Sequence, residues 1–370
     1  MAATLIGLTG IGARAQSLDG PGLPALWQSA FSIRSGGGYK DNVFLSHQRP
    51  QGSAAVSAGA DFSALRFAPD GPQFTFFAGA DANFFLSTKP AHDEYSAFAQ
   101  AQLEKDLTAG VTSWLAAEYA SQDQILDVAF LDPSVSVTNP AVRATQIRGH
   151  TLGLRPGLSV DLSSQNSLAL EIPATRQYYE QPLDDYWNTG LKLTLGHSYG
   201  NSSQFSLSYE PAWRWYDTDP ARTASGAPIP GSNRQRFLQD ANLSWRHHWD
   251  EGKRWRTVAK LGGRLVEENG AGYADYGQLS TSAQIRYRAR EWEASVESGV
   301  RAYRYASQTI SATDSEKLRR ADWTTTLRLE RGLTKHLSAI VSYEHEEILS
   351  NVETETYTVN TISGSLQWAF

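Results

Sequence analysis

Hydrophobic and polar residues alternate along most of the chain with a period of two. From position 205 to 215 the odd positions carry Phe, Leu, Tyr, Pro, Trp and Trp, whereas the even positions carry Ser, Ser, Glu, Ala and Arg. Residues 255–261 and 279–287 repeat this alternation. Successive side chains of a β-strand point to opposite faces of its sheet. Each such segment therefore predicts a strand with one apolar face and one polar face.

The alternating segments predict about sixteen strands, an even number that suits a closed antiparallel barrel. Their connections are alternately short, as at 163–166, and long, as at 217–235. Barrels of the outer membrane have short periplasmic turns and longer external loops, so the alternation also predicts an orientation. The predicted strands span 27–40, 53–66, 73–86, 95–107, 110–121, 146–161, 166–178, 187–199, 203–216, 236–249, 254–267, 276–288, 290–305, 321–331, 335–347 and 357–370.

Alternation alone does not distinguish a membrane barrel from a soluble sandwich. A sandwich buries its apolar faces against each other, whereas a membrane barrel turns them to lipid and lines a wet interior with its polar faces. Aromatic residues at strand ends favour the barrel, because interfacial girdles place Trp and Tyr at headgroup depth. We therefore predict an all-β, closed antiparallel transmembrane barrel, one domain over 16–370, in contact with the lipid of a Gram-negative outer membrane. The tryptophans at predicted strand ends are Trp27, Trp187, Trp213, Trp255, Trp292, Trp323 and Trp368.

The N-terminal residues predict export. Residues 2–15 are largely apolar and end in Ala13-Arg14-Ala15, a small-x-small cleavage signal. We expect 1–15 to be a signal peptide that is truncated, because it lacks a basic leading region. The alternative is an apolar N-terminal segment buried in the fold.

The last strand carries a second export feature. Phe370, Trp368 and Leu366 alternate with the polar residues Gln367 and Ser365. This arrangement resembles the C-terminal β-signal of Gram-negative outer-membrane barrels. The resemblance implies that the insertion machinery of the outer membrane binds this strand.

A barrel of this size encloses more space than side chains can fill, which predicts an aqueous channel. Acids dominate the inward face of the first seven predicted strands, and bases dominate strands eight to twelve. Opposed charges across a pore orient polar or ionic solutes. The alternative is that these charges form ion pairs between neighbouring strands. The residues predicted to line the pore are Arg34, Arg214, Arg246, Arg256, Lys260, Arg264, Arg286, Arg301, Arg328, Asp61, Asp81 and Glu118.

The third long connection, 122–145, contains an unusually apolar stretch at 125–131. An exposed loop gains nothing from such a surface. We expect this loop to fold into the lumen and narrow it, with Asp127 or Asp132 facing the arginines, in which it resembles the constriction loop of general porins. Asp123 and Phe130 belong to the same expected constriction. The alternative is a loop that packs against its neighbours or against a partner protein.

Several chemistries are excluded or unsupported. The chain has no cysteine, which excludes disulfides, thiolate metal sites and cysteine nucleophiles. Its formal charge of −6 gives no footprint for nucleic acid. His247 and His248 are adjacent, so a strand points them to opposite faces and they cannot chelate one metal. We find no nucleophile elbow and no Ser–His–acid set, and we expect neither an enzyme nor a metal or cofactor.

The first predicted hairpin carries one family resemblance. Residues 36–45 are GGGYKDNVFL, which resembles the G-Y-x-D-N-[VI]-[FY] start of a set of outer-membrane barrels. Some members are similar to proteins encoded with exopolysaccharide synthesis and export systems. The resemblance implies envelope secretion partners, and lumen aromatics such as Phe77, Trp114 and Tyr303 could stack on sugars. The alternative is that these rings pack against the wall.

Three functions follow in order of preference. The first is a pore for small polar or anionic solutes, the second is an accessory barrel of an exopolysaccharide secretion system, and the third is a structural or adhesive surface barrel. A wall of small outward residues on the predicted strands 2 to 5 also suggests a homo-oligomer, because small residues permit close protein contact. This wall contains Ala54, Ala58, Ala60, Ala78, Ala80, Ala97, Ala99 and Ala101.

Overall fold

The structure is a computed structural model that describes residues 27–67, 71–87, 93–127, 144–180, 183–200, 202–310 and 314–370. These residues form one antiparallel sheet of 18 strands, with a single 3-10 turn at Glu353–Glu355 (η2). Within the described ranges, no helix is long and apolar enough to cross a membrane. The strands are β1 (Trp27–Lys40), β2 (Ser53–Arg66), β3 (Gln73–Phe85), β4 (Glu94–Thr108), β5 (Val111–Asp127), β6 (Ala144–Asp161), β7 (Asn166–Glu171), β8 (Ala174–Tyr179), β9 (Tyr186–Gly190), β10 (Lys192–Tyr199), β11 (Ser203–Tyr216), β12 (Gln235–His248), β13 (Trp255–Glu268), β14 (Tyr276–Arg288), β15 (Trp292–Thr309), β16 (Lys317–Gly332), β17 (Leu337–Ser350) and β18 (Tyr357–Ala369).

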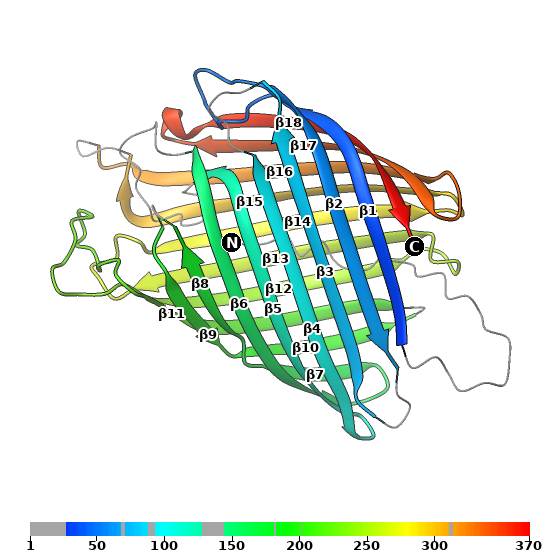
Figure 1. Cartoon of the computed structure of the whole chain (residues 1–370). Coiled ribbons are helices and arrows are strands. Elements are labelled where there is room, and N and C mark those ends of the chain that lie inside the picture. Colours follow the sequence, from blue (N-terminus) through cyan, green and yellow to red (C-terminus); the bar gives the residue numbers. More distant parts are fainter. Residues whose placement is uncertain are drawn as a thin grey trace, which may run out of the picture.

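The sheet closes on itself, because β1 pairs with both β2 and β18 (Figure 1, dark blue beside red). Strands β7 and β8 both pair with β6, and β9 and β10 both pair with β11, so each of these couples is one interrupted strand of the wall. Counted in this way, the structure is a closed barrel of 16 strands. The predicted fold class and strand number are confirmed.

The two interruptions face each other in the wall. Pro173, between β7 and β8, has no N–H to give to the ladder. Its carbonyl oxygen accepts a 3.0 Å hydrogen bond from the N–H of Gly190, at the end of β9. A Cβ at Gly190 would lie 2.8 Å from the carbonyl oxygen of Pro211, so this close approach requires glycine. The sequence predicted two continuous strands here, and this proline and glycine explain the difference.

The outer face of the sheet is apolar and the inner face is polar, as an outer-membrane barrel requires. On β13, Trp255, Leu261 and Leu265 are 47–55% exposed on the outer face, whereas Lys260 and Arg264 alternate with them on the inner face. A soluble protein rarely exposes so much contiguous apolar surface, but lipid covers it in a membrane.

The strands meet long connections at one end of the barrel, which we call the long-loop end, and short connections at the other, the short-turn end. Exposed tryptophans lie towards both ends of the outer face, as aromatic girdles do. Which end faces the periplasm stays a prediction. At the short-turn end lie Trp27, Trp255, Trp292 and Trp368, and towards the long-loop end lie Trp187, Trp213 and Trp323.

The C-terminal strand forms the seam that closes the barrel. Trp368 lies directly across from Ile33 of β1. The ring of Phe370 stacks on that of Phe31 at 5.8 Å, and its N–H donates to the Phe31 carbonyl over 2.9 Å. The predicted signal peptide, 1–15, lies outside the described residues.

Candidate functional site

Many charged side chains of the lumen form ion pairs along the wall. Arg34 on β1 pairs with Asp61 on β2 and, at 2.7 Å, with Asp81 on β3. The other predicted residues brought into such pairs are Glu118 with Arg155 at 3.2 Å, Arg264 with Asp240 at 2.6 Å, Arg286 with Glu293 at 2.7 Å, and Arg328 with Glu330 at 3.1 Å. Arg301 lies directly across from Asp322. The pairs of Arg34, Glu118, Arg264 and Arg286 join different strands, as in the alternative that we considered, whereas Arg328 pairs within its own strand. The role of these residues in lining a pore stays a prediction.

A group of basic side chains interrupts this pattern in the short-turn half of the lumen. We call Arg246, Arg256, Lys260 and Arg286, on β12 to β14, the basic cluster. Arg256 lies directly across from Arg286 and donates a 3.0 Å hydrogen bond to Gln284. Among the described residues neither Arg246 nor Lys260 has an ion-pair partner, and Lys260 is exposed. The cluster therefore gives one side of the lumen an excess of positive charge.

At the long-loop end the lumen is packed with buried tyrosines. Each is at most 9% exposed, and apolar side chains such as Leu238, Val266 and Leu318 fill the spaces between some of them. Val352, from the connection after β17, also packs against this group. Only Tyr303 was singled out from the sequence. The tyrosines are Tyr186, Tyr216, Tyr276, Tyr303, Tyr305 and Tyr357.

A salt bridge crosses the barrel at the same end. Arg320 on β16 lies 3.2 Å from Asp127 on β5, and its Nε lies 2.6 Å from Asp322. All three side chains are at most 2% exposed. Several strands separate β5 from β16 in both directions around the wall, so the contact spans the interior. We call this group the cross-barrel bridge.

The first residues of the expected constriction loop belong to a strand. Strand β5 continues to Asp127 instead of ending near residue 121, because its ladder with β6 runs unbroken from Val111 to Asp127. Asp123 and Asp127 are thus strand residues, and Asp123 pairs with Arg148 at 2.8 Å. Asp127 does contact an arginine of the far wall. Phe130 and Asp132 lie outside the described residues, so the entry of the loop into the lumen stays a prediction.

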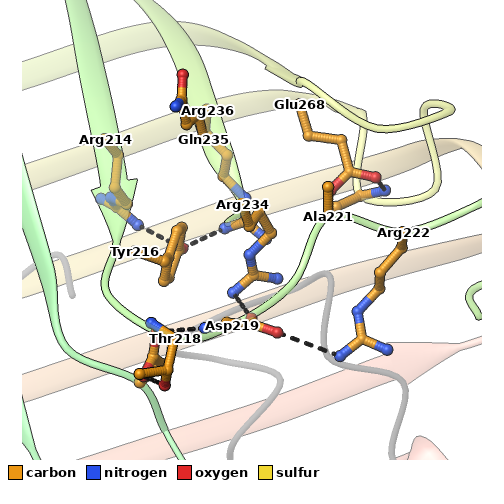
Figure 2. Close-up of polar contacts among 12 residues, drawn as sticks. Arg214, Tyr216, Thr218, Asp219, Ala221, Arg222, Arg234, Gln235, Arg236 and Glu268 are labelled. Atoms are coloured by element: carbon orange, nitrogen blue, oxygen red, sulfur yellow. Dashed lines mark hydrogen bonds and ion pairs between the residues drawn. The ribbon is translucent and has the colours of Figure 1, made fainter. Parts of the chain in front are cut away.

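An arginine–tyrosine cluster joins the lumen to the long connection after β11 (Figure 2). The Tyr216 hydroxyl accepts a 2.9 Å hydrogen bond from Arg236, and the Arg234 guanidinium lies 4.0 Å from the centre of the Tyr216 ring. Arg214, predicted to line the pore, stacks 4.2 Å over Tyr186. Asp219 pairs with Arg234 and, at 3.5 Å, with Arg222. Part of the positive charge of these arginines is therefore compensated by contacts with tyrosine rings and by the Asp219 carboxylate.

The aspartate of a neighbouring ion pair lies outside the membrane-spanning strands. Asp217, just after β11, accepts a 2.9 Å hydrogen bond from Arg176 of β8. This charged hydrogen bond holds the pKa of Asp217 below its ordinary value. The contact ties the connection after β11 to the wall two strands away.

The lumen aromatics that we considered for sugar stacking pack against the wall. Phe77 lies 6.1 Å from Phe98, and Tyr303 lies 6.0 Å from Tyr276, between ring centres. The Trp114 ring fills the space where a side chain at position 157 would be, which requires Gly157. In the described part of the chain, no group of three or more acidic or histidine side chains is placed to hold a metal ion.

Comparison with known proteins identifies the class of fold. No protein-family model and no curated protein matches the sequence. A BenF-like porin from Pseudomonas fluorescens Pf-5 superposes with a TM-score of 0.50 at 8% identity, over 93% of this chain and 99% of that one. The fold is that of an outer-membrane porin-like barrel.

Two further solved structures superpose less closely on this porin-like barrel. OccAB1 from Acinetobacter baumannii has a TM-score of 0.47 at 9% identity, over 93% of this chain and 96% of that one. A structure titled bacterial polysaccharide outer membrane secretin has a TM-score of 0.44 at 11% identity, over 92% and 98%. At these identities the likeness concerns the fold and not what passes through it.

Proposed function

We propose that this protein is a pore of the Gram-negative outer membrane for small polar or anionic solutes, and not an enzyme. The observation that carries the proposal is the basic cluster on the inner face of a closed barrel, where Lys260 is exposed and has no ion-pair partner among the described residues. Because the surrounding wall is apolar on its outer side, the field of these charges is concentrated in the lumen. An anion entering from the short-turn end meets this field first.

Single-channel recording across a salt gradient tests the proposal. We expect the wild type to prefer anions and the double variant Arg246→Glu with Lys260→Glu to lose at least about half of that preference, because two positive charges of the cluster become negative and cancel the two that remain. The matched control exchanges the partners of an ion pair, as Glu118→Arg with Arg155→Glu, and leaves the net charge unchanged. The proposal is wrong if the basic-cluster variant and the control have the selectivity of the wild type.

The second candidate, an accessory barrel of an exopolysaccharide secretion system, is favoured by the cross-barrel bridge. A lumen crossed by a buried ion pair and filled with buried tyrosines at one end suits a barrel that opens only with a partner. The sequence of residues 36–45 supports the same function. In bilayers such a barrel would stay silent alone and conduct when its secretion partners are added, whereas a passive pore conducts alone.

We also propose that the small-residue wall mediates self-association. The sheet register places Ala60, Ala80 and Ala97 directly beside one another on β2, β3 and β4, and Ala78 directly beside Ala99. Small residues allow a second barrel to approach closely. Native mass measurement in detergent should show an oligomer that Ala80→Trp disrupts, and a wild type that is monomeric throughout would contradict this.

A further inference from the structure

A groove of about 540 Å³ lies in the outer face of the barrel, towards the long-loop end of β12 to β15. Its lining includes the small residues Ala241, Gly263, Gly277 and Ala302, together with Tyr209 and Arg304. Elsewhere the outer face of these strands carries exposed large apolar side chains such as Leu261, Ile285 and Val296. The groove is therefore a hollow in a surface that otherwise contacts lipid.

The two glycines keep the groove open. A Cβ at Gly263 would have no atom within 4 Å, and one at Gly277 would meet only the Leu265 side chain, at 3.6 Å. Neither glycine has a positive φ, so the backbone does not require glycine at these positions. Leu265 and Leu279, 55% and 60% exposed, project beside the empty space. Larger side chains at positions 263 and 277 would fit this space, but the sequence has glycine at both.

Arg304 lines the groove on the outer face, and Arg319 lies beside it on the next strand. Arg304 of β15 is directly across from Arg319 of β16, and its neighbours Tyr303 and Tyr305 are buried on the opposite face. Arg319 is 3.6 Å from Glu316, whereas Arg304 has no ion-pair partner in the described part of the chain. Like charges directly opposite in a sheet are destabilising. An anion bound between the two guanidinium groups would remove this cost.

The position of Arg304 along the barrel axis corresponds to the level of the lipid headgroups. Trp292 begins β15 at the short-turn end, and Arg304 follows twelve residues later. At about 3.3 Å per residue and a tilt of about 40°, this is roughly 30 Å along the barrel axis, more than the apolar band of about 25 Å. Arg304 thus lies at headgroup level, with the groove on the hydrocarbon side of it.

We propose that this groove binds an anionic, phosphate-bearing lipid, with one acyl chain along Gly263 and Gly277 and the phosphate between Arg304 and Arg319. The charge of the arginine pair and the apolar hollow below it are complementary to the two parts of such a molecule. The site lies on the outer face, so it does not depend on conduction through the lumen.

Native mass spectrometry of the full chain, taken from nanodiscs of mixed phosphatidylcholine and phosphatidylglycerol, tests this site. We expect the wild type to retain phosphatidylglycerol selectively, and Arg304→Gln with Arg319→Gln to bind it about tenfold more weakly. Gly263→Leu with Gly277→Leu should lose the lipid while keeping both arginines. Arg148→Gln is the control, because Arg148 already pairs with Asp123 and Glu180 at the same end of the barrel.

Three outcomes would overturn the lipid site. One is equal retention of phosphatidylglycerol by the wild type and the arginine variant. Another is full retention by the glycine variant, which would mean that the groove holds no acyl chain. The third is complete displacement of the lipid by inorganic phosphate, which would mean that the arginines bind phosphate alone. Selective conduction of anions could persist under all three, so the failure of this site is distinguishable from failure of the pore.

Discussion

Arg320 is a buried residue that links opposite walls of the lumen at the long-loop end. Its guanidinium reaches Asp127 across the barrel and Asp322 on its own strand. Removing one partner of a buried ion pair leaves the other charge uncompensated, which is strongly destabilising. Arg320 has two carboxylates, so losing the one on the far wall opens the lumen while the arginine keeps a partner.

The variant Asp127→Asn isolates the cross-barrel bridge. We expect a larger single-channel conductance than in the wild type and a loss of stability of about 3 kcal/mol, at the lower end for a broken buried pair. Conductance and urea unfolding in lipid vesicles measure the two effects. Asp123→Asn, which removes a carboxylate of the same strand that pairs with exposed Arg148, is the control. An unchanged conductance in Asp127→Asn would show that the bridge does not obstruct the lumen.

The pair of Asp217 and Arg176 predicts a dependence on pH. The pKa of Asp217 is lowered in the folded protein, so the pair stabilises the fold fully above the ordinary aspartate value of about 4 and less as the pH falls through the lowered value. Because Asp217 is partly exposed, we expect at most about 0.5 kcal/mol at neutral pH. The thermal midpoints of the wild type and Asp217→Asn should differ at pH 7 and converge near pH 2. A difference that grows on acidification would contradict the sign.

At the scale of single strands, the alternation of polar and apolar side chains sufficed to predict most strands of the barrel wall. Strands β1, β2 and β11 begin and end at the predicted residues, because apolar and polar side chains alternate along them as far as turn-forming residues such as Gly, Asn and Asp. The interruptions at Pro173 and Gly190 were missed, since each depends on the neighbouring strand. The extension of β5 to Asp127 was missed because polar and apolar residues cease to alternate where lipid contact ends.

The terminal strand makes an element-scale prediction. Phe370 is 67% exposed, so its side chain contributes little to the stability of the closed barrel. If the insertion machinery binds this terminus, Phe370→Ala should reduce assembly in cells about severalfold but leave spontaneous folding into lipid vesicles unchanged. Heat-modifiable migration on gels measures both. Phe31→Ala removes the same ring contact and leaves the terminus intact, so it should assemble normally in cells. Equal losses in cells and vesicles would mean that the residue acts through stability.

At the scale of the whole molecule, closure creates contacts that no local pattern contains. Asp127 and Arg320 are 193 positions apart on strands that are not neighbours. Their contact depends on the cross-section of the barrel and on how its ends bend. The buried tyrosines depend on strand pairing, because each strand contributes only one or two and their ring contacts join neighbouring strands. The sequence could therefore predict which face is polar, but not where the lumen is wet and where it is packed.

The central claim is that the charged face of each strand surrounds water and the apolar face contacts lipid. Because the chain has no cysteine, single cysteines at neighbouring positions of β13 report on the two faces directly. In lipid vesicles, a small membrane-impermeant thiol reagent with access to the short-turn end should modify Lys260→Cys and leave Leu261→Cys unmodified. Modification of Leu261→Cys with protection of Lys260→Cys would contradict the account.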